Sequence, residues 1–398
     1  MRPQRCVLVK YGELMLKGQN HAWFERRLFE HLERAVAGLE HPVRIERRGG
    51  VVVLTSDNEQ EHVVRRARRV IGLSLVQPAL RVDQTAESAA EAAVRLIAEQ
   101  HDPTGRRRFA VRARRRYKPF PLTSEQLAAH IGQQVRDAYG WPVDLDHPEV
   151  EVSVEVDRAE IFVSLVRHRG QGGLPVGTSG RALVLLSGGY DSPVAGYRAM
   201  RRGLRCDFVH FTGAPYTNAS SIYKAYALVR QLNRYQGDAR LHVISVGHAQ
   251  RALATAGASG SQVVAQRRLY LQVAEALAGQ LGAQALVTGD SLGQVSSQTL
   301  TNLANAEQAC ALPLLRPLLA WDKDEIVAEA QRIGTSEVSV LPDEDCCTMI
   351  TPPRVETRTS ARQLRRIEQR ADVEDWVGKL LANAQVLDPG DPHASPED

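Results

Sequence analysis

The stretch Leu185-Leu186-Ser187-Gly188-Gly189-Tyr190-Asp191-Ser192 decides the fold of this 398-residue chain. Its first two residues end the apolar run Ala182–Leu186. Because apolar and polar residues do not alternate in this run, it is typical of a parallel strand covered on both faces. A helix is predicted directly after it, over Pro193–Arg202. Two adjacent glycines between a buried strand and a helix let several backbone N–H groups converge, because no Cβ atom obstructs them. The stretch therefore predicts an anion-binding loop.

Downstream of this loop, apolar runs of strand length alternate with amphipathic segments of helix length. The predicted elements are strand Asp207–Phe211, helix Ser221–Tyr235, strand Leu241–Val246, helix Val263–Leu281 and strand Ala285–Thr288. Such alternation predicts an α/β fold with an open, doubly wound parallel sheet, whose ligand lies at the carboxyl ends of the strands.

The glycine loop differs from the two commonest phosphate-binding patterns. It lacks the lysine of GxxxxGK[ST], and its glycine spacing is not that of GxGxxG. It resembles the SGGxDS signature of the PP-loop ATP pyrophosphatases, which split ATP between the α and β phosphates and transfer AMP to an oxygen. Pyrophosphate would be held by Gly188, Gly189 and the hydroxyls of Ser187 and Ser192, and Asp191 could bind Mg²⁺. A simple turn before a capped helix is the structural alternative.

Positive charge is concentrated in the N-terminal part of the chain. Residues 1–170 hold 28 Lys and Arg against 23 Asp and Glu, whereas residues 171–398 hold 22 against 23. A polyanion would therefore bind the N-terminal part, although a basic run is often only a solvated face.

Short strands and helices are predicted in this N-terminal part. They are strands Cys6–Val9, Val51–Leu54 and Phe109–Arg114, helices Trp23–Ala37 and Ala86–Glu99, a helix from His62 with Arg65, Arg66, Arg68 and Arg69, a helix after Thr123, and a hairpin of Val150–Val156 and Ile161–Val166.

A basic stripe follows from strand alternation over Phe109–Arg116. Arg112, Arg114 and Arg116 turn to one face, with about 6.6 Å between successive side chains, a spacing that can follow a phosphate backbone. The full predicted contact with nucleic acid is Arg106, Arg107, Arg108, Arg112, Arg114, Arg116 and Lys118.

Composition also suggests where the chain divides. The stretch Arg169–Gly180 contains five glycines and one proline, which is the composition of a linker. We predict two small α/β modules over 1–60 and 61–169, a linker over 170–180, and the parallel-sheet domain over 181–385. Residues 386–398 hold four acids and no Lys or Arg, so they are predicted to be a disordered tail.

Composition excludes two other classes of protein. No apolar run approaches the ~18 residues that span a bilayer, and no charged-then-apolar leader follows Met1. We therefore expect a cytoplasmic protein without a membrane partner. The five cysteines are scattered except for Cys346-Cys347, which is neither a disulfide framework nor a zinc-binding pattern.

Four further blocks carry a family resemblance. They are Tyr11–Asn20 followed by Phe24-Glu25, Arg114–Pro121, Thr288–Thr299, and Glu344–Thr348 followed by Pro352-Pro353. Together with the glycine loop they resemble the tRNA 4-thiouridine synthetase (ThiI) family, of the type that lacks a rhodanese domain.

The resemblance implies a ferredoxin-like domain, a THUMP RNA-binding domain and a PP-loop domain that together make 4-thiouridine at position 8 of tRNA. ATP adenylates O4 of the uracil, pyrophosphate leaves, a persulfide sulfur attacks C4 and AMP departs. The additional implied ATP contacts are Leu185, Leu186, His210, Phe211, Arg267, Gly289 and Gln298. Without the family, His210 would be a strand-end histidine with satisfied ring nitrogens. Sulfur transfer for the thiazole of thiamine is left open.

A single lysine is the implied catalytic cation. Asp322-Lys323-Asp324-Glu325 predicts a capping box that places Lys323 in the first turn of a helix. A cation there opposes the helix dipole by about 0.3–1 kcal/mol, which an exposed lysine tolerates, so a solvated lysine is the alternative. The chain has six lysines beside 44 arginines. The family has a catalytic lysine at the matching position, which implies that Lys323 neutralises charge on the α-phosphate.

Sulfur must arrive in an activated form, and a cysteine persulfide is the obvious carrier. Archaeal relatives use a CxxC to hold an iron–sulfur cluster, but the matching stretch, Val264–Arg268, has no cysteine, so no cluster is expected. Cys346 and Cys347 are the predicted catalytic cysteines, and Cys346 is the better match to the family. A separate cysteine desulfurase would supply the sulfur. Two buried thiols without chemistry are the alternative.

Two other classes of function stay open. One is a different PP-loop enzyme, such as a 2-thiouridylase, a lysidine synthetase or an amide synthetase, which would lack the Tyr11–Asn20 opening. The other is an RNA-binding protein whose nucleotide site is regulatory, which tRNA-dependent release of pyrophosphate would exclude. The sequence also leaves a homodimer open.

Overall fold

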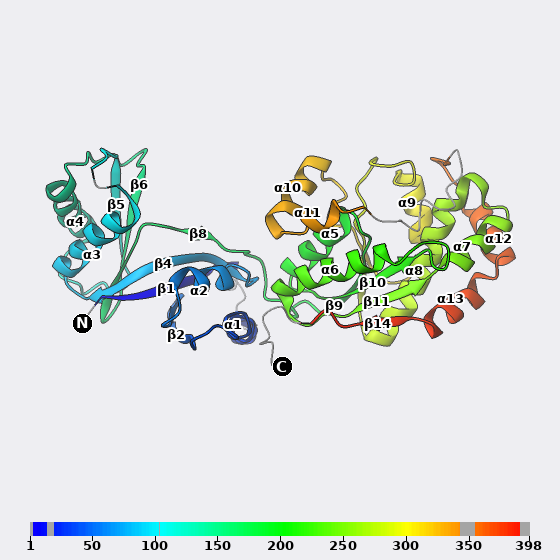
Figure 1. Cartoon of the computed structure of the whole chain (residues 1–398), viewed down its shortest axis with the longest axis horizontal. Helices are drawn as coiled ribbons and strands as arrows, with labels where there is room; N and C mark the ends of the chain where they lie inside the picture. Colours follow the sequence, from blue (N-terminus) through cyan, green and yellow to red (C-terminus); the bar gives the residue numbers. More distant parts are fainter. Residues whose placement is uncertain (1–2, 14–19, 103, 343–354, 391–398) are drawn as a thin grey trace. The chain divides into compact units, whose positions relative to one another are not determined.

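The computed structural model describes the chain except for residues 1–2, 14–19, 103, 343–354 and 391–398. Contacts between Cα atoms divide the chain into two units. The first holds Met1–Ala22 and Leu32–Gly173, and the second holds Trp23–His31 and Leu174–Asp398. Each unit has its own sheet with helices packed against it (Figure 1). The finer division at residues 60 and 61 stays a prediction.

The first unit is built on one sheet in the order β2-β3-β1-β4-β7-β6-β5, with β8 paired to β4. The strands are β1 (Gln4–Tyr11), β2 (Arg44–Arg48), β3 (Val51–Thr55), β4 (Leu73–Asp83), β5 (Phe109–Arg115), β6 (Val150–Val156), β7 (Glu160–Ser164) and β8 (His168–Arg169). The helices of this part of the chain are α1 (His21–Val36), α2 (Gln60–Ala67), α3 (Ala86–Gln100) and α4 (Ser124–Tyr139). They confirm the predicted helices to within a few residues.

The central strand β4 was not predicted from the sequence. Pro78 lies in its middle, and proline is rare in central strands because it cannot donate a hydrogen bond. β4 pairs antiparallel with β1 and, from Leu80 onward, with β7. Because one strand joins both sets of neighbours, the two predicted N-terminal modules share a single sheet.

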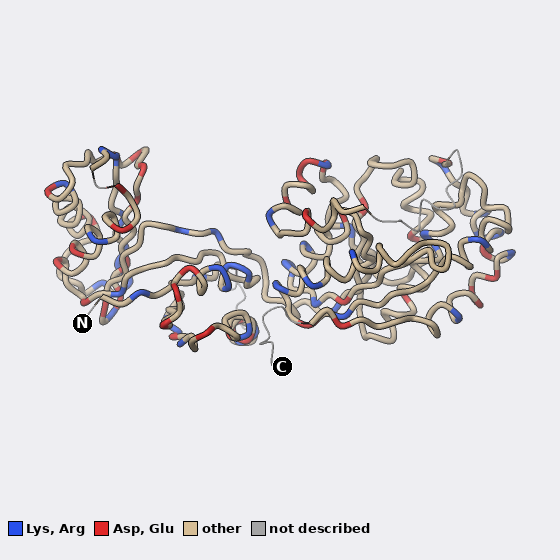
Figure 2. Tube along the Cα trace, viewed as in Figure 1, with Lys and Arg blue, Asp and Glu red and all other residues tan. Residues whose placement is uncertain are grey.

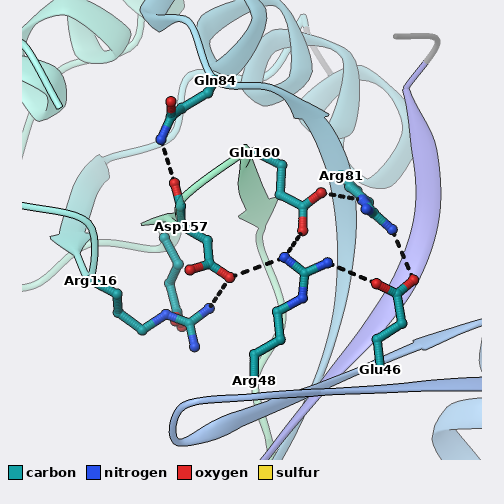
Figure 3. A network of polar contacts seen from close by, with 8 residues as sticks. Glu46, Arg48, Arg81, Gln84, Arg116, Asp157 and Glu160 are labelled. Atoms are coloured by element: carbon teal, nitrogen blue, oxygen red, sulfur yellow. Dashed lines mark hydrogen bonds and ion pairs between the residues drawn. The ribbon is translucent and has the colours of Figure 1, made fainter. Parts of the chain in front are cut away.

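A network of ion pairs crosses this sheet (Figure 3). The guanidinium of Arg48 on β2 lies 2.7 Å from Glu46 and 3.3 Å from Asp157, and it also contacts Glu160. Arg81 on β4 pairs with Glu160 at 2.6 Å and with Glu46 at 3.1 Å. These pairs link β2 to β4 and β7, which are not its neighbours in the sheet order, so they hold the edge strand β2 to these two strands.

The glycine-rich segment predicted as a linker makes regular backbone hydrogen bonds. The N–H of Gly172 donates to Leu73 O at 2.7 Å, and the N–H of Leu174 donates to Arg201 O at 3.0 Å. A Cβ on Gly170 would lie 2.2 Å from Leu73 O, so only glycine fits there. The glycines of this segment therefore permit close packing of the backbone, and its role as a linker stays a prediction.

The second unit has a six-stranded sheet in the order β13-β12-β9-β10-β11-β14. The strands are β9 (Arg181–Leu185), β10 (Arg205–Thr212), β11 (Leu241–Ser245), β12 (Ala285–Val287), β13 (Leu314–Leu315) and β14 (Gln385–Leu387). All neighbours are parallel except β11 and β14. The chain runs from β9 outward through β10 and β11, then crosses back to β12 on the other side of β9. This confirms the predicted doubly wound parallel sheet, with its switch point between β9 and β12.

Helices cover both faces of this sheet (Figure 1). They are α5 (Asp191–Arg201), α6 (Ser220–Gln236), α7 (Gly247–Thr255), α8 (Gln262–Leu281), α9 (Leu300–Glu307), α10 (Lys323–Ile333), α11 (Ser336–Ser339), α12 (Ala361–Arg370) and α13 (Val373–Ala382). A hydrophobic core of the unit lies between the sheet and one face of α8, with α7, α12 and α13 packed around that helix. Within the described part of the chain, no helix is long and apolar enough to cross a membrane.

The start of the predicted tail differs from the expectation. Val386 and Leu387 belong to β14, which pairs antiparallel with β11. Asn233 on α6 donates a hydrogen bond to Gly390 O at 3.0 Å. The acidic residues that suggested disorder follow an apolar edge strand, and that strand orders residues 385–390. Residues 391–398 lie outside the described residues.

Candidate active site

A cavity of about 530 Å³ opens at the switch point of the second unit. Its walls come from the loop after β9, from α8 and from the loop after β12. Of the predicted ATP and catalytic residues, those that line it are Leu185, Ser187, Asp191, Ser192, Arg267, Gly289 and Gln298. A cavity of this size, at the carboxyl ends of parallel strands, fits a nucleotide.

The loop after β9 is held in shape by its two serines. The Oγ of Ser192 accepts a hydrogen bond from Ser187 N at 2.8 Å and lies 3.1 Å from Ser187 Oγ. Ser187 Oγ also accepts from Gly189 N at 3.3 Å. Helix α5 begins at Asp191, so its first N–H groups and the positive end of its dipole lie at the cavity. The loop and the start of α5 therefore lie at the cavity, and the binding of an anion by this loop stays a prediction.

Gly289 brings the two loops of the site together. A Cβ at this position would lie 2.6 Å from Ser192 N and 2.8 Å from Asp191 C. Real side chains do not approach backbone so closely, so any other residue would push the loop after β12 away from α5. This close approach explains why the residue at position 289 is glycine, which the family resemblance did not explain.

Two of the four predicted catalytic residues, Asp191 and Lys323, are in contact. Lys323 Nζ lies 2.7 Å from Asp191 Oδ1, and Gln294 Nε2 donates to Asp191 Oδ2 at 3.1 Å. The lysine opens α10, whose capping box between Asp322 and Glu325 is confirmed. The lysine side chain is 47% exposed. A cation 132 positions away in the sequence therefore lies at the end of the glycine loop, where α5 begins.

A buried carboxylate that the sequence reasoning did not single out organises the opposite wall. Asp290 contacts the guanidinium of Arg267, lies 3.3 Å from Nε of Arg316, and accepts from Thr288 Oγ1 at 2.8 Å. Burial opposes ionisation, but the two guanidinium groups and the Thr288 hydroxyl hold the pKa of Asp290 below its usual range. The sequence did contain a signal for this residue, namely an acidic residue shortly after a buried strand at the switch point.

Two buried polar atoms at the cavity have no hydrogen-bond partner in the described structure. They are Nη2 of Arg316 and Oε1 of Gln298, and both residues line the cavity. A buried donor and a buried acceptor are costly when unpaired, so both point to a polar ligand. A nucleotide fits this pair, since its phosphates accept hydrogen bonds and its base and ribose donate them.

His210 and Phe211 lie beside the cavity rather than in its lining. The ring nitrogens of His210 lie 2.9 Å from Leu186 O and 3.1 Å from Ser221 Oγ. Phe211 stacks on Tyr270, with ring centroids 4.5 Å apart, and Tyr270 lines the cavity. The geometry thus matches the alternative of a satisfied strand-end histidine, and a contact of either residue with ATP stays a prediction. Leu186, Gly188 and Gly189 are likewise outside the lining.

Cys346 and Cys347 lie outside the described residues. The three described cysteines are free thiols. Burial raises the pKa of Cys6 to about 12, and it also raises the pKa of Cys206. Burial and the neighbouring Glu275 raise the pKa of Cys310 to about 11. A protonated thiol is a poor nucleophile, so none of these three is suited to carry sulfur.

Three of the six arginines in the predicted contact with nucleic acid pair with carboxylates. Figure 2 shows that positions of Lys and Arg are interspersed with positions of Asp and Glu along this part of the chain. Arg108 pairs with Asp144 and Glu149, and Arg112 lies 3.8 Å from Glu151. Arg116 is only 16% exposed and lies 3.7 Å from both Glu155 and Asp157 (Figure 3). Within the described ranges, Arg106, Arg114 and Lys118 are exposed and Arg107 is half-buried. The alternation of β5 is as predicted, but the acidic residues of β6 and its turn neutralise part of the stripe.

No group of three or more metal-binding side chains occurs within the part of the chain that the structure describes. Asp191 is the one carboxylate of the loop after β9. A Mg²⁺ ion commonly takes one or two carboxylates together with phosphate oxygens and water, so this single acid is compatible with a metal that arrives with the nucleotide.

Substitutions of the two aspartates of the site should differ in their effect on the free energy of unfolding. Asp290→Asn should lower the free energy of unfolding by about 3 kcal/mol, because two partly buried guanidinium groups lose their carboxylate. Asp191→Asn should change it by less than about 1 kcal/mol, because its partner is exposed. Since the pKa of Asp290 is lowered, its stabilising effect is fully present above about pH 4 and is lost as the pH falls through the folded-state value.

Urea denaturation of both variants and the unchanged chain at pH 7 measures this difference. Equal stability of Asp290→Asn and the unchanged chain would contradict the assigned role of the carboxylate.

Three family models match the chain. They are the ThiI ferredoxin-like domain over residues 6–76, the THUMP domain over residues 83–166, and "Thiamine biosynthesis protein (ThiI)" over residues 177–373. A solved structure, a 4-thiouridine synthetase in complex with RNA and with bound ATP, matches with a TM-score of 0.87 and 30% identity, covering 97% of this chain and 99% of that one.

Two relatives are named probable tRNA sulfurtransferase. The one from Nocardia farcinica is 60% identical over 393 residues, which cover 97% of this chain and 94% of the relative. The one from Thermus thermophilus is 41% identical over 377 residues, which cover 95% of this chain and 92% of the relative. With similarity of this degree over nearly its whole length, the chain belongs to the ThiI family of tRNA sulfurtransferases.

Proposed function

We propose that this protein is an ATP-dependent tRNA sulfurtransferase that makes 4-thiouridine at position 8 of tRNA. The observation that carries the proposal is the contact of Lys323 with Asp191, which lines a nucleotide-sized cavity. The names of the relatives and the RNA and ATP of the similar solved structure agree with it. Among adenylating enzymes, the THUMP match favours an RNA substrate.

Each wall of the cavity has a role in this reaction. The apolar part, with Tyr270 and Leu271, suits adenine, and the loop Ser187–Ser192 suits the β and γ phosphates that leave. Arg267 and Arg316 stand on the other side and would neutralise phosphate charge. Electrostatic stabilisation of the leaving pyrophosphate and of the α-phosphate lowers the barrier to attack by the uracil oxygen.

Asp191 and Lys323 would exchange partners when the substrate binds. Mg²⁺, when bound, would take Asp191 and phosphate oxygens as ligands and stabilise charge on the leaving group. Lys323 would then be released from the carboxylate and would reach the α-phosphate. The exposure of its side chain allows this movement.

Cys346 and Cys347 are the proposed carriers of sulfur. The raised pKa values of Cys6 and Cys310 remove them as competitors and support this choice. A cysteine desulfurase of the cytoplasm, where tRNA is modified, would load the persulfide. The thiamine name of the family model makes a thiazole precursor a second acceptor to test.

The exposed arginines of β5 are the proposed contact with the tRNA backbone. Changing both Arg112 and Arg114 to alanine should reduce the slope of log affinity against log salt by up to about 2, because two phosphate contacts are lost. Arg136→Ala on α4, also exposed, serves as the control and should leave the slope unchanged. Filter binding of tRNA at several salt concentrations measures the slope. An unaltered slope in the double variant would exclude these residues.

One assay tests the proposed function as a whole. The protein, ATP, unmodified tRNA, L-cysteine and a purified cysteine desulfurase are incubated, and tRNA nucleosides are analysed by mass spectrometry. The expected result is 4-thiouridine together with pyrophosphate release that requires tRNA. Pyrophosphate release without tRNA, or thiolation at the 2-position, would refute it. The mass of the same preparation in solution shows whether two copies form a homodimer.

A further inference from the structure

Three arginines from two helices of the second unit lie close together. Arg198 and Arg201 belong to α5, and Arg332 belongs to α10, which packs against α5 (Figure 1). We call these three residues the α5–α10 arginine cluster. Residues 171–398 hold 22 Lys and Arg against 23 Asp and Glu, so composition predicts no basic surface in this part of the chain. The cluster is a local feature that only the fold brings together.

Two members of the cluster share one carboxylate and stack on aromatic rings. Glu329 lies 2.7 Å from Arg332 and 3.8 Å from Arg198. The guanidinium carbon of Arg198 lies 4.8 Å from the centre of the Trp321 ring. That of Arg332 lies 5.1 Å from the centre of the Tyr197 ring, and Arg332 also donates to the Tyr197 hydroxyl at 2.8 Å. Stacking holds a guanidinium group in place without neutralising its charge.

The third member, Arg201, differs from the other two in its contacts. Its Nε is buried and has no hydrogen-bond partner, and its guanidinium forms no ion pair with the described residues. Burial, together with the positive charges of Arg198 and Arg332, lowers the pKa of Arg201. An arginine nevertheless stays charged at neutral pH. A half-buried cation beside two other cations is unfavourable, and a bound anion would relieve this repulsion.

Both helices of the cluster begin at the proposed catalytic pair. Asp191 opens α5 and Lys323 opens α10, and their side chains are in contact. Along the axis of α5, Arg198 and Arg201 follow Asp191 by about 10 Å and about 15 Å. Arg332 follows Lys323 by about 14 Å along α10. An anion at the cluster would therefore lie about 10–15 Å from the proposed catalytic pair.

The anion that suits this place is a phosphate of an RNA backbone. The planar guanidinium group matches the oxygens of a phosphate, with which it forms paired hydrogen bonds. The phosphates of ATP are proposed to lie at the loop Ser187–Ser192, which precedes the opposite end of α5. An RNA strand that places its uracil in the cavity continues away from it, and its neighbouring phosphates are the anions within reach of the cluster.

We propose that the α5–α10 arginine cluster binds a phosphate of the tRNA backbone near the target uridine. This inference rests on the proposed function. It gives the second unit its own contact with tRNA, in addition to the contact proposed for β5. A phosphate contact positions the strand and reads no base, so the cluster adds affinity and register rather than sequence specificity.

Filter binding of tRNA at several salt concentrations tests the site. Arg201→Gln should reduce the slope of log affinity against log salt by about 0.7–0.9, because one phosphate contact is lost. Arg198→Gln, which removes a second cation of the cluster, should give a fall of similar size. Arg201→Lys keeps the positive charge and should keep most of the slope. In pyrophosphate release, Arg201→Gln should raise the KM for tRNA by about tenfold, as expected for the loss of a charged hydrogen bond, and should leave the KM for ATP unchanged.

Arg366→Gln is the matched control. Arg366 is an exposed arginine on α12, which packs against α8 and α13. The variant has the same change in net charge as Arg201→Gln, but at a different place on the same unit. Its salt slope and its KM for tRNA should equal those of the unchanged protein. Urea denaturation shows whether each variant is folded.

The outcomes separate the site from the proposed function. A lower slope in Arg201→Gln and Arg198→Gln, but not in Arg201→Lys or Arg366→Gln, supports the phosphate site. An unchanged slope in the two glutamine variants of the cluster, or an equal fall in Arg201→Lys or Arg366→Gln, overturns it. Binding of tRNA by the unchanged protein without tRNA-dependent pyrophosphate release overturns the proposed function alone. If the unchanged protein does not bind tRNA, both are overturned.

Discussion

Replacing Lys323 with alanine is expected to lower tRNA-dependent pyrophosphate release by about 10²- to 10³-fold, because a cation that stabilises the α-phosphate in the transition state is lost. Binding of tRNA should not change. Stability should fall by less than about 1 kcal/mol, since the pair with Asp191 is exposed. Radiolabelled pyrophosphate release and filter binding of tRNA measure the two properties separately.

Lys379→Ala provides the control for this variant. Lys379 also lies on a helix and pairs with an aspartate, Asp375, at 2.5 Å, and its side chain is 59% exposed. Its loss should affect neither pyrophosphate release nor thiolation. Normal pyrophosphate release by Lys323→Ala would contradict the catalytic role of this lysine. Lys323 would then be only an exposed ion-pair partner of Asp191.

Replacing Cys346 with serine is expected to reduce 4-thiouridine formation more than about 10³-fold, because the nucleophile that carries sulfur is removed. Pyrophosphate release should continue, since adenylation precedes sulfur transfer. Cys347→Ser should have the smaller effect of the two. Nucleoside mass spectrometry of tRNA after incubation with a cysteine desulfurase gives the yield for each variant.

Cys310→Ser is the matched control, because Cys310 lies in the same unit and has a raised pKa of about 11. The Cys310→Ser variant should form 4-thiouridine in tRNA at the normal rate. Full activity in both Cys346→Ser and Cys347→Ser would exclude the pair as sulfur carriers.

The parallel-sheet domain could be predicted because its signals are local. Apolar runs such as Ala182–Leu186 are buried on both faces, and the two glycines of the loop mark where strand gives way to helix. The capping box at Asp322 is local as well, and it correctly placed Lys323 in a first helical turn. Strand β4 was missed for the same reason, because Pro78 weakens a local pattern that its two neighbouring strands stabilise in the fold.

The arrangement of the site could be predicted only in part. Contact between Asp191 and Lys323 depends on how α5 and α10 pack, which no spacing in the sequence encodes. The role of Asp290 arises from two arginines that approach it from α8 and from the residue after β13. The pairing of Arg116 with acidic neighbours is equally a product of the tertiary structure. The composition shows how many basic residues the N-terminal part has. Only the fold shows which of them are paired with acidic side chains.

The central strand of the first unit fixes the separation of the groups at its two ends. β4 is 11 residues long and pairs with both halves of its sheet, so it spans about 36 Å as one stiff rod. Groups at its two ends cannot shift independently, as they could if a flexible hinge joined two separate modules. Contacts that a ligand makes near both ends of β4 would therefore keep a fixed separation.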